Sequence, residues 1–442
     1  MEKSLFIEYV SKVWPKLSLF IQEKVNNQKK PLKYYHKEML TPVYSADQKW
    51  EGTSANTTYV AADMVAMDSP LPLKTRDSIA QASGKLPKVG MKKQLKETQI
   101  NAINIMKAQL SMMSDANAKK SQLQRIFNKI TDDGYACSVG IDERNEANFL
   151  KGLSDGIILV QDEENTGTGL RINYGYLPSH SFGVETAGTV TGDDIERVTS
   201  KADDDGNSLS VVAIALSTYN KIRKSQWAKE LVAGYKEQVV TETSKLPVPT
   251  ATSFDEAFKA EYNLDFLKID RTVIIEKNGK RNSYKPFNAN KLIFLPSADN
   301  VGSLVWGTLA EDTNRVNGVE YATVDGYKLI SRYSKTDPLQ EFTNGQALVL
   351  PVIENVDQIY SLDLSEAQVV DTEKEATDST DVKITIWGQT YKKLEFVKEL
   401  NKITGGRLSD KTTDEKVIQT VNKLNDEEEA ALKAAVESHK SE

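Results

Sequence analysis

The chain has 442 residues and a formal net charge of −7. Its 39% hydrophobic and 27% charged residues give enough apolar material for packed cores, which excludes a wholly disordered chain. The acidic balance argues against nucleic-acid binding as the main task, because phosphate neutralisation supplies much of the affinity of such proteins. The length favours two or three domains.

Cysteine usage and hydropathy exclude further classes of protein. The single cysteine, Cys137, cannot form a disulfide framework within the chain or a cysteine zinc cluster. The N-terminus lacks the apolar core of a signal peptide, and no stretch reaches the roughly 20 apolar residues of a membrane span. We therefore expect a soluble protein that is not secreted and has no membrane contact.

The first 50 residues begin with an amphipathic pattern that predicts a helix ending near Pro15. The remainder, through Pro31 and Pro42, is interpreted as an extended arm. We expect its aromatic residues to need a partner surface, because an arm of this kind cannot offset its ordering entropy alone. These residues are Tyr34, Tyr35, Tyr44 and Trp50.

A long aperiodic stretch and a long helix follow. Residues 51–98 show neither helical nor strand periodicity, which is typical of a functional loop or of one that contacts another chain. Apolar residues at helical spacing then predict a single helix over about 118–154, roughly 50 Å long at 1.5 Å per residue. It would end at Gly156, before the strand IILV (157–160).

The second half of the chain is predicted to be rich in strands. Residues 161–380 are interpreted mostly as strands, with short helices such as Ser217 to Ala233. The segment 272–284 predicts a hairpin, because Asn278-Gly279 between β-branched and polar runs suits a type I′ turn. Residues 381–442 predict a separate module with a strand before three helices, the last starting at the acidic run 426–429.

Residues with catalytic or metal-binding potential are scattered. The three histidines, His36, His180 and His439, match no metal-ligand spacing, and we interpret each as a loop or surface residue. Cys137 is interpreted as a small buried residue, since no base is expected beside it. The sequence therefore predicts no catalytic, cofactor-binding or metal-binding residue.

The run Asp203-Asp204-Asp205-Gly206 resembles a calcium loop only in composition. Placing Gly206 at loop position 6 puts Lys201 at position 1 and Val212 at position 12, and neither residue suits its position. The informative features are architectural, and arms and long loops point to assembly before catalysis.

Four stretches, in this order, resemble parts of a known family. MDSPLPLKTRDSIAQASGKLPKVG (67–90) looks like its extended loop, and DDGYACSVGIDERNEANFLKGLSDG (132–156) looks like its spine helix. IIEKNGKRNSYKPFNANKLIFLPSADNVGSLVWGTLAE (274–311) is similar to its late hairpin motif, and DPLQEFTNGQALVLPVIENVDQIYSLDL (337–364) to its closing strands. The chain thus resembles the major capsid proteins of tailed bacteriophages, with the Hong Kong 97-type fold shared by encapsulins, and in particular the phage lambda capsid protein E branch.

The resemblance covers roughly residues 60–370 and implies an α+β tailed-phage major capsid fold. The small helical module at its C-terminal side is extra to the family pattern. The implied parts are an N-terminal arm (1–50), an extended loop (51–98), a peripheral domain with the spine helix (99–190), an axial domain with returning strands (191–380) and the C-terminal helical module (381–442).

The same resemblance implies the function. The protein would be no enzyme but a structural protein that assembles into pentamers and hexamers of an icosahedral capsid, enclosing double-stranded DNA without sequence-specific binding. It would need no cofactor. It would have a portal and, as further candidates, scaffold or decoration proteins as partners, and it would reside in the virion after assembly in the host bacterial cytoplasm.

Two alternatives remain open at this stage. One is an encapsulin-like compartment shell. The other is a strand-rich surface or glycan-binding protein, which would lack the long helix. The strand LIFL (292–295) and the glycine turns after it would lie in the axial domain and pack against neighbours, and Trp306 would either contact a neighbour or fill its own core.

Overall fold

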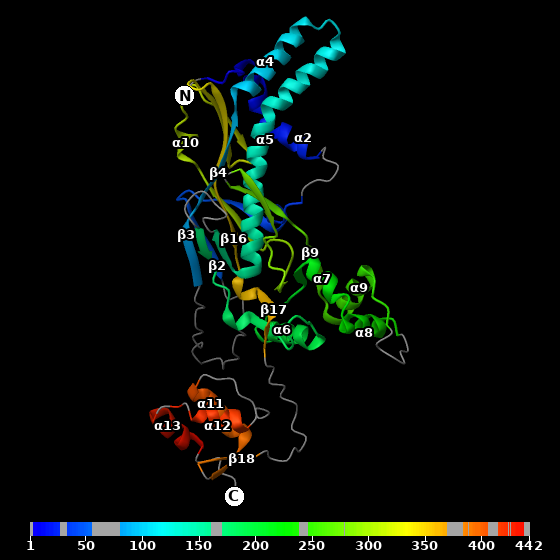
Figure 1. The fold of residues 1–442 in the computed structure, drawn as a ribbon, viewed down its shortest axis with the longest axis vertical. Coiled ribbons are helices and arrows are strands. Elements are labelled where there is room, and N and C mark those ends of the chain that lie inside the picture. Colours follow the sequence, from blue (N-terminus) through cyan, green and yellow to red (C-terminus); the bar gives the residue numbers. More distant parts are fainter. Residues whose placement is uncertain are drawn as a thin grey trace, which may run out of the picture. The chain divides into compact units, whose positions relative to one another are not determined.

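The computed structural model describes most of the chain, which divides into two compact units, Met1–Val369 and Val370–Glu442. Helices and strands mix in the first unit, so the α+β class expected from the sequence is confirmed (Figure 1). No described helix combines the length and apolar character needed to cross a membrane. The described residues are 3–26, 33–54, 80–160, 170–237, 246–277, 279–368, 383–387, 389–404, 414–422, 424 and 426–436.

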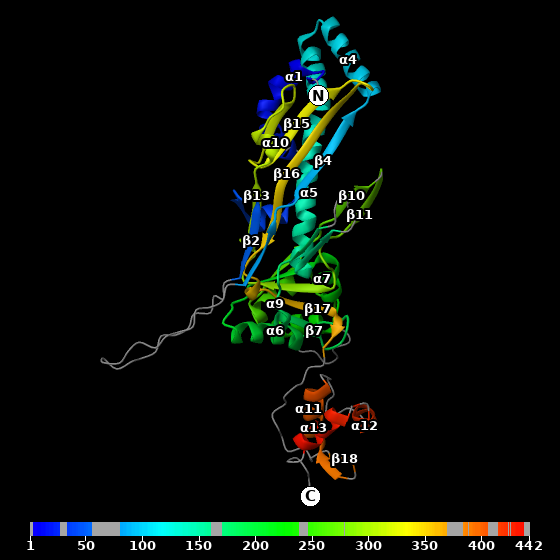
Figure 2. The same ribbon diagram turned by 90° about the vertical axis from the view of Figure 1, so that its left-hand side faces the viewer.

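Helix α5 (Ala116–Asp155) lies along the long strands of the first unit (Figure 2). The Asp115 side chain caps its start by accepting a hydrogen bond from the Ala118 N–H at 2.6 Å. Gly156 ends it in the left-handed conformation, with φ 69°, a position that favours glycine. The helix predicted over about 118–154 and its stop at Gly156 are thereby confirmed.

A six-stranded sheet packs against α5. The edge strand β1 pairs in parallel with β13, whereas the other pairs of this sheet are antiparallel. Gly345 of strand β16 (Gln340–Ile353) faces α5, where an added Cβ would lie 2.6 Å from Cys137 Cβ. The order is β1 (Leu40–Tyr44), β13 (Gly302–Gly307), β16 (Gln340–Ile353), β15 (Lys328–Lys335) and β14 (Glu320–Val324), with β4 (Lys88–Leu95) also paired to β16.

A five-stranded sheet forms the core of the rest of the first unit. Four helices pack with it, so the interpretation of residues 161–380 as mostly strands is wrong for the stretch 192–262. Its order is β7 (Ser181–Val184), β17 (Tyr360–Ala367), β12 (Lys291–Leu295), β8 (Val211–Ala215) and β9 (Asp265–Ile269). The helices are α6 (Gly192–Asp204), α7 (Leu216–Ile222), α8 (Gln226–Tyr235) and α9 (Ala251–Tyr262).

The helix expected from Ser217 to Ala233 is in fact two helices. Helix α7 ends at Ile222, and the Ser225 side chain then caps α8 by accepting a hydrogen bond from the Ala228 N–H. A serine that satisfies a free backbone N–H in this way favours a new helix start over continuation.

The segment with the LIFL strand connects the two sheets. Strand β12 is buried in the five-stranded sheet, whereas β13 belongs to the six-stranded sheet. The placement of this whole segment in one axial domain is therefore corrected, since β13 and the strands up to β16 pair beside α5. Trp306 on β13 contacts Tyr44 and Tyr327 of its own chain, with ring centroids 4.8 and 6.2 Å away.

The N-terminal residues fold onto their own chain. Helix α1 (Ile7–Val13) ends beside Pro15 as predicted, but a 3₁₀ turn, η1 (Trp14–Lys16), and a second helix, α2 (Leu17–Asn26), continue it. The buried side chains of this segment pack on Ile126 and Ile130 of α5. They are Phe6, Val10, Trp14, Leu17 and Ile21.

The expectation that an outside surface covers the arm aromatics is wrong for three of the four. Tyr34, Tyr35 and Trp50 are buried within the chain, whereas Tyr44 is 52% exposed. The reason is that the short helix α3 (Tyr35–Met39) and strand β1 join the six-stranded sheet and α5.

The aperiodic stretch 51–98 has ordered ends. Strands β2 (Lys49–Ser54) and β3 (Ala80–Lys85) pair antiparallel from Lys49↔Lys85 to Ser54↔Ala80, and β4 follows. The interpretation of these ends as loop is therefore wrong, while residues 55–79 lie outside the described part of the chain. Helix α4 (Glu97–Met112), which the sequence pattern did not reveal, precedes α5.

Smaller elements complete the first unit. The predicted hairpin at 272–284 is confirmed as β10 (Val273–Lys277) and β11 (Lys280–Tyr284), with Gly279 at φ 76° in its turn. Strand β5 (Ile157–Val160), also predicted, pairs with β6 (Leu170–Asn173). The remaining elements are the 3₁₀ turns η2 (Pro178–His180) and η4 (Val356–Gln358) and helix α10 (Ala310–Thr313).

The second unit has its own core of buried residues. The predicted strand and three helices are confirmed, and a second strand is added that the sequence did not reveal. The elements are β18 (Lys383–Ile386), β19 (Gln389–Lys392), α11 (Lys393–Thr404), α12 (Asp414–Val421) and α13 (Asp426–Val436).

The contact between Gly345 and α5 gives a first prediction. Gly345→Ala should lower the free energy of unfolding of the first unit by about 1–3 kcal/mol, because the new methyl group meets the Cys137 Cβ and main chain, which cannot rotate away. The control is Gly234→Ala in α8, where nothing lies within 4 Å and alanine favours the helix by about 0.5–1 kcal/mol. Urea unfolding followed by tryptophan fluorescence measures both, and equal midpoints for the two variants would contradict the packing described.

Candidate functional site

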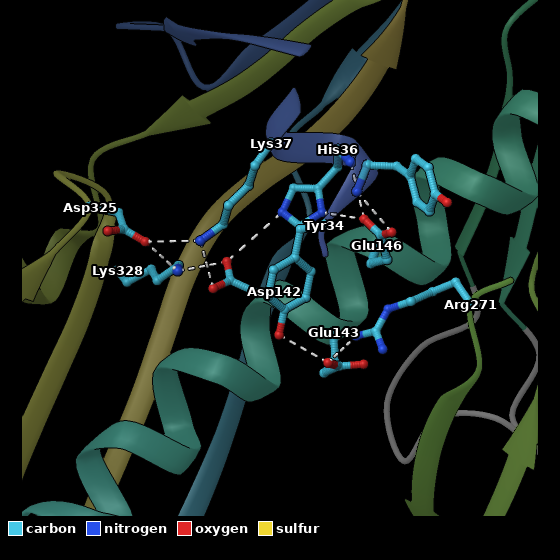
Figure 3. A network of polar contacts seen from close by, with 10 residues as sticks. Tyr34, His36, Lys37, Asp142, Glu143, Glu146, Arg271, Asp325 and Lys328 are labelled. Carbon is cyan, nitrogen blue, oxygen red and sulfur yellow. Dashed lines mark hydrogen bonds and ion pairs between the residues drawn. The ribbon is translucent and has the colours of Figure 1, made fainter. Parts of the chain in front are cut away.

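A polar network joins the segment 33–37 to helix α5 and to the turn between β14 and β15 (Figure 3). We call it the α5 network. Its members come from four separate stretches of the chain, and the central ones are buried. They are Tyr34, His36, Lys37, Asp142, Glu143, Glu146, Arg271, Asp325 and Lys328.

Glu146 holds the start of helix α3. Its fully buried carboxylate accepts hydrogen bonds from the backbone N–H groups of Tyr35 and His36, each at 3.0 Å. The same carboxylate lies 2.7 Å from His36 Nδ1, so this nitrogen carries the proton when Glu146 is ionised. A carboxylate at a helix N-terminus satisfies free N–H groups, and here it also fixes the histidine ring.

Two carboxylates surround a fully buried lysine. Lys328 Nζ lies 2.6 Å from Asp142 Oδ1 and 2.6 Å from Asp325 Oδ2. Lys37 Nζ bridges the same acids, 2.9 Å from Asp142 Oδ2 and 3.5 Å from Asp325 Oδ2 (Figure 3). Two cations and two anions thus alternate, so each charge that loses water gains an opposite partner.

The pKa values of this group follow from its charges. Burial alone would raise the pKa of Asp325, but Lys328 and Lys37 outweigh it and hold that pKa below the usual 3.8. Burial alone would lower the pKa of Lys37, but Asp142 and Asp325 outweigh it and raise that pKa above 10.5. Both shifts favour the ion-paired state at neutral pH.

A third branch reaches the base of the β10–β11 hairpin. Glu143 accepts a hydrogen bond from the Tyr34 hydroxyl at 2.9 Å and forms an ion pair with Arg271. The Arg271 guanidinium also lies over the Tyr34 ring, 5.2 Å from its centroid. Burial, with the negative charge of Glu143, raises the pKa of Tyr34 and keeps its hydroxyl a donor.

A second buried ion pair holds the very start of the described chain. Arg332 on β15 and Glu341 on β16 are fully buried, with Nε and Oε1 2.6 Å apart. Ser4 donates a hydrogen bond to Glu341, and Arg332 donates to the Ile130 carbonyl of α5. Helix α1 is therefore fixed to the sheet by charge as well as by apolar packing.

The structure places two of the three histidines inside the protein. His36 lies in the α5 network, and His180 is buried with its ring stacked on Tyr360 and its Nε2 3.2 Å from Asp205. Burial lowers the pKa of His180 although Asp205 opposes this. The interpretation of both as loop or surface residues is therefore wrong, and His439 lies outside the described residues.

Asp205 and Cys137, also considered from the sequence, make contacts within the fold. Asp205 of the acidic run accepts a hydrogen bond from the Tyr360 hydroxyl at 2.8 Å and pairs with Lys201. Cys137 is buried as predicted, 3.6 Å from the Thr343 carbonyl, and burial raises its pKa to about 12. Among the described residues, no group of three or more His, Cys, Asp or Glu could hold a metal ion.

Sequence reasoning missed the α5 network. Its one readable signal is the pair Asp142 and Glu146, four residues apart and therefore on one face of a helix, next to the apolar Ile141 and Phe149. Acidic residues inside an apolar stripe need buried partners. The partners themselves cannot be read from the pattern, because His36 precedes Glu146 by 110 residues.

The buried lysine gives a second prediction. Lys328→Met should destabilise the first unit by about 3–5 kcal/mol, because it leaves Asp142 and Asp325 without their central cation. The matched control, Lys335→Met, removes an exposed lysine at the end of the same strand and should change stability by less than about 0.5 kcal/mol. Chemical unfolding distinguishes them, and a Lys328→Met protein as stable as the control would show that the ion pairs contribute nothing.

The lowered pKa of Asp325 gives a third prediction. Its ion pairs contribute stability that is complete above pH 3.8 and is lost as the pH falls through the lowered folded pKa. Asp325→Asn should therefore unfold more easily than the wild type at about pH 7, with the difference shrinking towards about pH 3. Urea titrations at the two pH values measure this, and a difference that stays constant with pH would refute it.

Three solved structures are similar to this chain over most of its length. One is the putative capsid protein of a prophage of Escherichia coli CFT073, which is 12% identical with a TM-score of 0.46. The match covers 78% of this chain and 98% of the prophage protein. The Cyanophage A-1(L) capsid asymmetric unit is 14% identical over 78% of this chain and 96% of its own, with a TM-score of 0.40. The virus-like particle from Pyrococcus furiosus is 11% identical over 79% of this chain and 98% of its own, with a TM-score of 0.34.

Because these TM-scores lie below 0.5, the family assignment depends on the sequence. Among curated proteins, none matches this chain. The family model described as Phage major capsid protein E matches residues 22–364, which is most of the chain and includes both sheets, α5 and the α5 network. The chain therefore belongs to the phage major capsid protein E family and is a structural subunit of a phage capsid shell, located in the virion and not an enzyme.

Proposed function

We propose that copies of this chain form pentamers and hexamers that close into an icosahedral capsid around a double-stranded DNA genome. The observation that carries this proposal is the family match over residues 22–364. Assembly takes place in the host bacterial cytoplasm, with a portal as a partner and with scaffold or decoration proteins as further ones. Closed symmetry lets many weak contacts between copies act together.

The paired strands β2 and β3 support a role for the loop between them in assembly. Ser54 pairs with Ala80, so a connection of 25 residues, 55 to 79, joins two adjacent strand ends. In this proposal so long a connection gains from a surface outside its own fold, which offsets its ordering entropy. We assign that surface to an adjacent subunit, with strands β2 and β3 and the residues between them as the extended loop.

The two sheets support the assignment of two different domains within the subunit. The six-stranded sheet and α5 form the peripheral domain, and the five-stranded sheet with α6–α9 forms the axial domain, which surrounds the five-fold and six-fold centres. The α5 network and the Arg332–Glu341 pair keep residues 3–26 and 33–44 on their own subunit. In this proposal the N-terminal residues complete the peripheral domain instead of extending beneath a neighbour.

The compartment-shell alternative makes a different prediction about the contents. An encapsulin-like shell would enclose protein cargo, whereas a capsid shell encloses the genome. The acidic balance of the chain suits a wall that does not retain DNA, since like charges repel. The glycan-binding alternative is no longer supported, because it required the absence of a long helix and α5 is present.

The fourth prediction concerns assembly. The purified recombinant chain should form closed shells, tubes or five- and six-membered rings in negative-stain electron microscopy, and should elute ahead of a monomer in size-exclusion chromatography. The control is a variant in which residues 56–78 are replaced by a short Gly-Ser linker. It should keep its fold, since β2 and β3 remain, but lose most of its assembly.

Two outcomes would contradict the proposal. A dimer or trimer that keeps its size at high concentration would exclude a shell subunit. Normal shells from the linker variant would show that the loop does not join subunits.

A further inference from the structure

The β10–β11 hairpin is a ribbon of two strands with no third strand beside it among the described residues. It stands out from the body of the first unit and points away from α6 and α9 (Figure 2). Its base is anchored, because Val273 is buried and Arg271 pairs with Glu143 of the α5 network. Two-stranded ribbons are marginally stable in water, so a projecting ribbon gains from a surface that covers it.

The hairpin is strongly basic in an acidic protein. Residues 271–285 contain five cations and one acid, a net charge of +4, whereas the whole chain has a net charge of −7. Lys277 and Lys280, next to the turn, have no ion-pair partner in the part of the chain that the structure describes. These two charges are therefore available to an acidic surface.

One face of the hairpin also exposes an apolar side chain. Ile274 is 63% exposed, opposite Ser283 in the ladder. Glu276 and Arg281 follow on the same face and pair with each other, Oε2 and Nε 2.8 Å apart. Lys277 and Lys280 lie on the opposite face, because side chains alternate along each strand. A ribbon with an exposed isoleucine on one face and free lysines near its turn on the other suits a protein surface with apolar and acidic parts. It does not suit a phosphate backbone, which Glu276 would repel.

A surface with these properties exists on the same chain. Residues 193–205, mostly helix α6, contain six acids and two cations, a net charge of −4. Asp193 and Glu196 are exposed on this helix, and Glu261 is exposed on α9. Burial, together with the negative charges of Glu196 and Glu261, raises the pKa of Tyr262 to about 12.

Two partly exposed aromatic rings lie between these acids. Trp227 and Tyr262 contact each other with ring centroids 6.4 Å apart, beside Gly192 at the start of α6. We call the surface of Asp193, Glu196, Trp227, Glu261 and Tyr262 the acidic–aromatic patch. Its acids match in charge the free lysines next to the turn of the hairpin.

We propose that the β10–β11 hairpin of one copy docks on the acidic–aromatic patch of a neighbouring copy. This inference rests on the proposed assembly function. The hairpin points away from α6 and α9 of its own chain (Figure 2), so we infer a contact between copies and not within one. It is heterologous, because each copy contributes a different surface to each of its two neighbours, and such contacts generate rings.

The fifth prediction tests this contact by charge reversal. Lys277→Glu with Lys280→Glu should reduce the yield of assembled particles about tenfold or more, because acids would then face acids across the interface. Glu196→Lys with Glu261→Lys should have the same effect. Combining all four changes should restore assembly to within about threefold of the wild type, since the two charge patterns are exchanged.

A matched control separates this contact from a general effect of charge. Lys119→Glu with Lys120→Glu changes the net charge equally at the exposed start of α5 and should assemble like the wild type. Circular dichroism and the thermal midpoint check that every variant is folded. Particle yield is measured by sedimentation and negative-stain counting under one set of salt conditions.

A second measurement needs no substitution. A zero-length carbodiimide joins lysine amines to neighbouring carboxylates in particles assembled from isotopically labelled and unlabelled chains. Mass spectrometry should find Lys277 or Lys280 of one copy linked to Asp193, Glu196 or Glu261 of another. Links from these lysines only to other parts of the chain would overturn the proposal.

Each remaining outcome also decides the question. Normal assembly of both reversal variants, or failure of the four-fold variant to recover, overturns the hairpin contact while the shell function stands. Normal shells that lose bound DNA in the hairpin variant overturn it too, and assign the hairpin to nucleic acid. A wild-type chain without self-association at any concentration overturns both this inference and the proposed function.

Discussion

The fold of the first unit depends on buried charges whose opposite partners meet in only one arrangement of its helices and strands. Taking Lys328, Glu146 and Arg332 out of water costs several kcal/mol each, and only opposite charges at hydrogen-bonding distance offset that cost. In each case the partner lies on a different element, so the N-terminal segment, α5 and the six-stranded sheet must meet in a single register. Apolar packing supplies the larger share of the stability, but many registers could satisfy it.

Fixing these elements gives the subunit a frame from which the proposed assembly surfaces project. Helix α5 runs along the long strands, and Gly345 allows the two to approach closely. The paired strands β2 and β3 leave this frame at one place and the β10–β11 hairpin leaves it at another, the latter anchored through Arg271 to the α5 network. A shell subunit needs such fixed projections, because contacts with neighbours repeat throughout a closed lattice and small errors in direction accumulate.

The local patterns of the sequence predict the elements whose causes are local. The periodicity of α5, its stop at Gly156, the Asn278-Gly279 hairpin and the helices of the second unit all follow from neighbouring residues. The ends of the aperiodic stretch were missed because β3 and β4 are rich in glycine, serine and lysine, and pairing with β2 and β16 makes them strands. The burial of Tyr34 and His36 was missed because their partners are more than 100 residues away. The change of sheet between β12 and β13 depends on pairings with strands that are not adjacent in sequence, which local patterns do not reveal.

The central claim is that each subunit folds its own N-terminal segment onto α5 before any neighbour is present. Amide hydrogen exchange of the unassembled chain, followed by mass spectrometry, tests it most directly. We expect residues 35–44 to exchange as slowly as residues 141–150 of α5, since the α5 network and the β1–β13 ladder protect them. Fast exchange of residues 35–44 in the unassembled chain, slowing only in assembled shells, would contradict it and show that a neighbouring copy orders this segment.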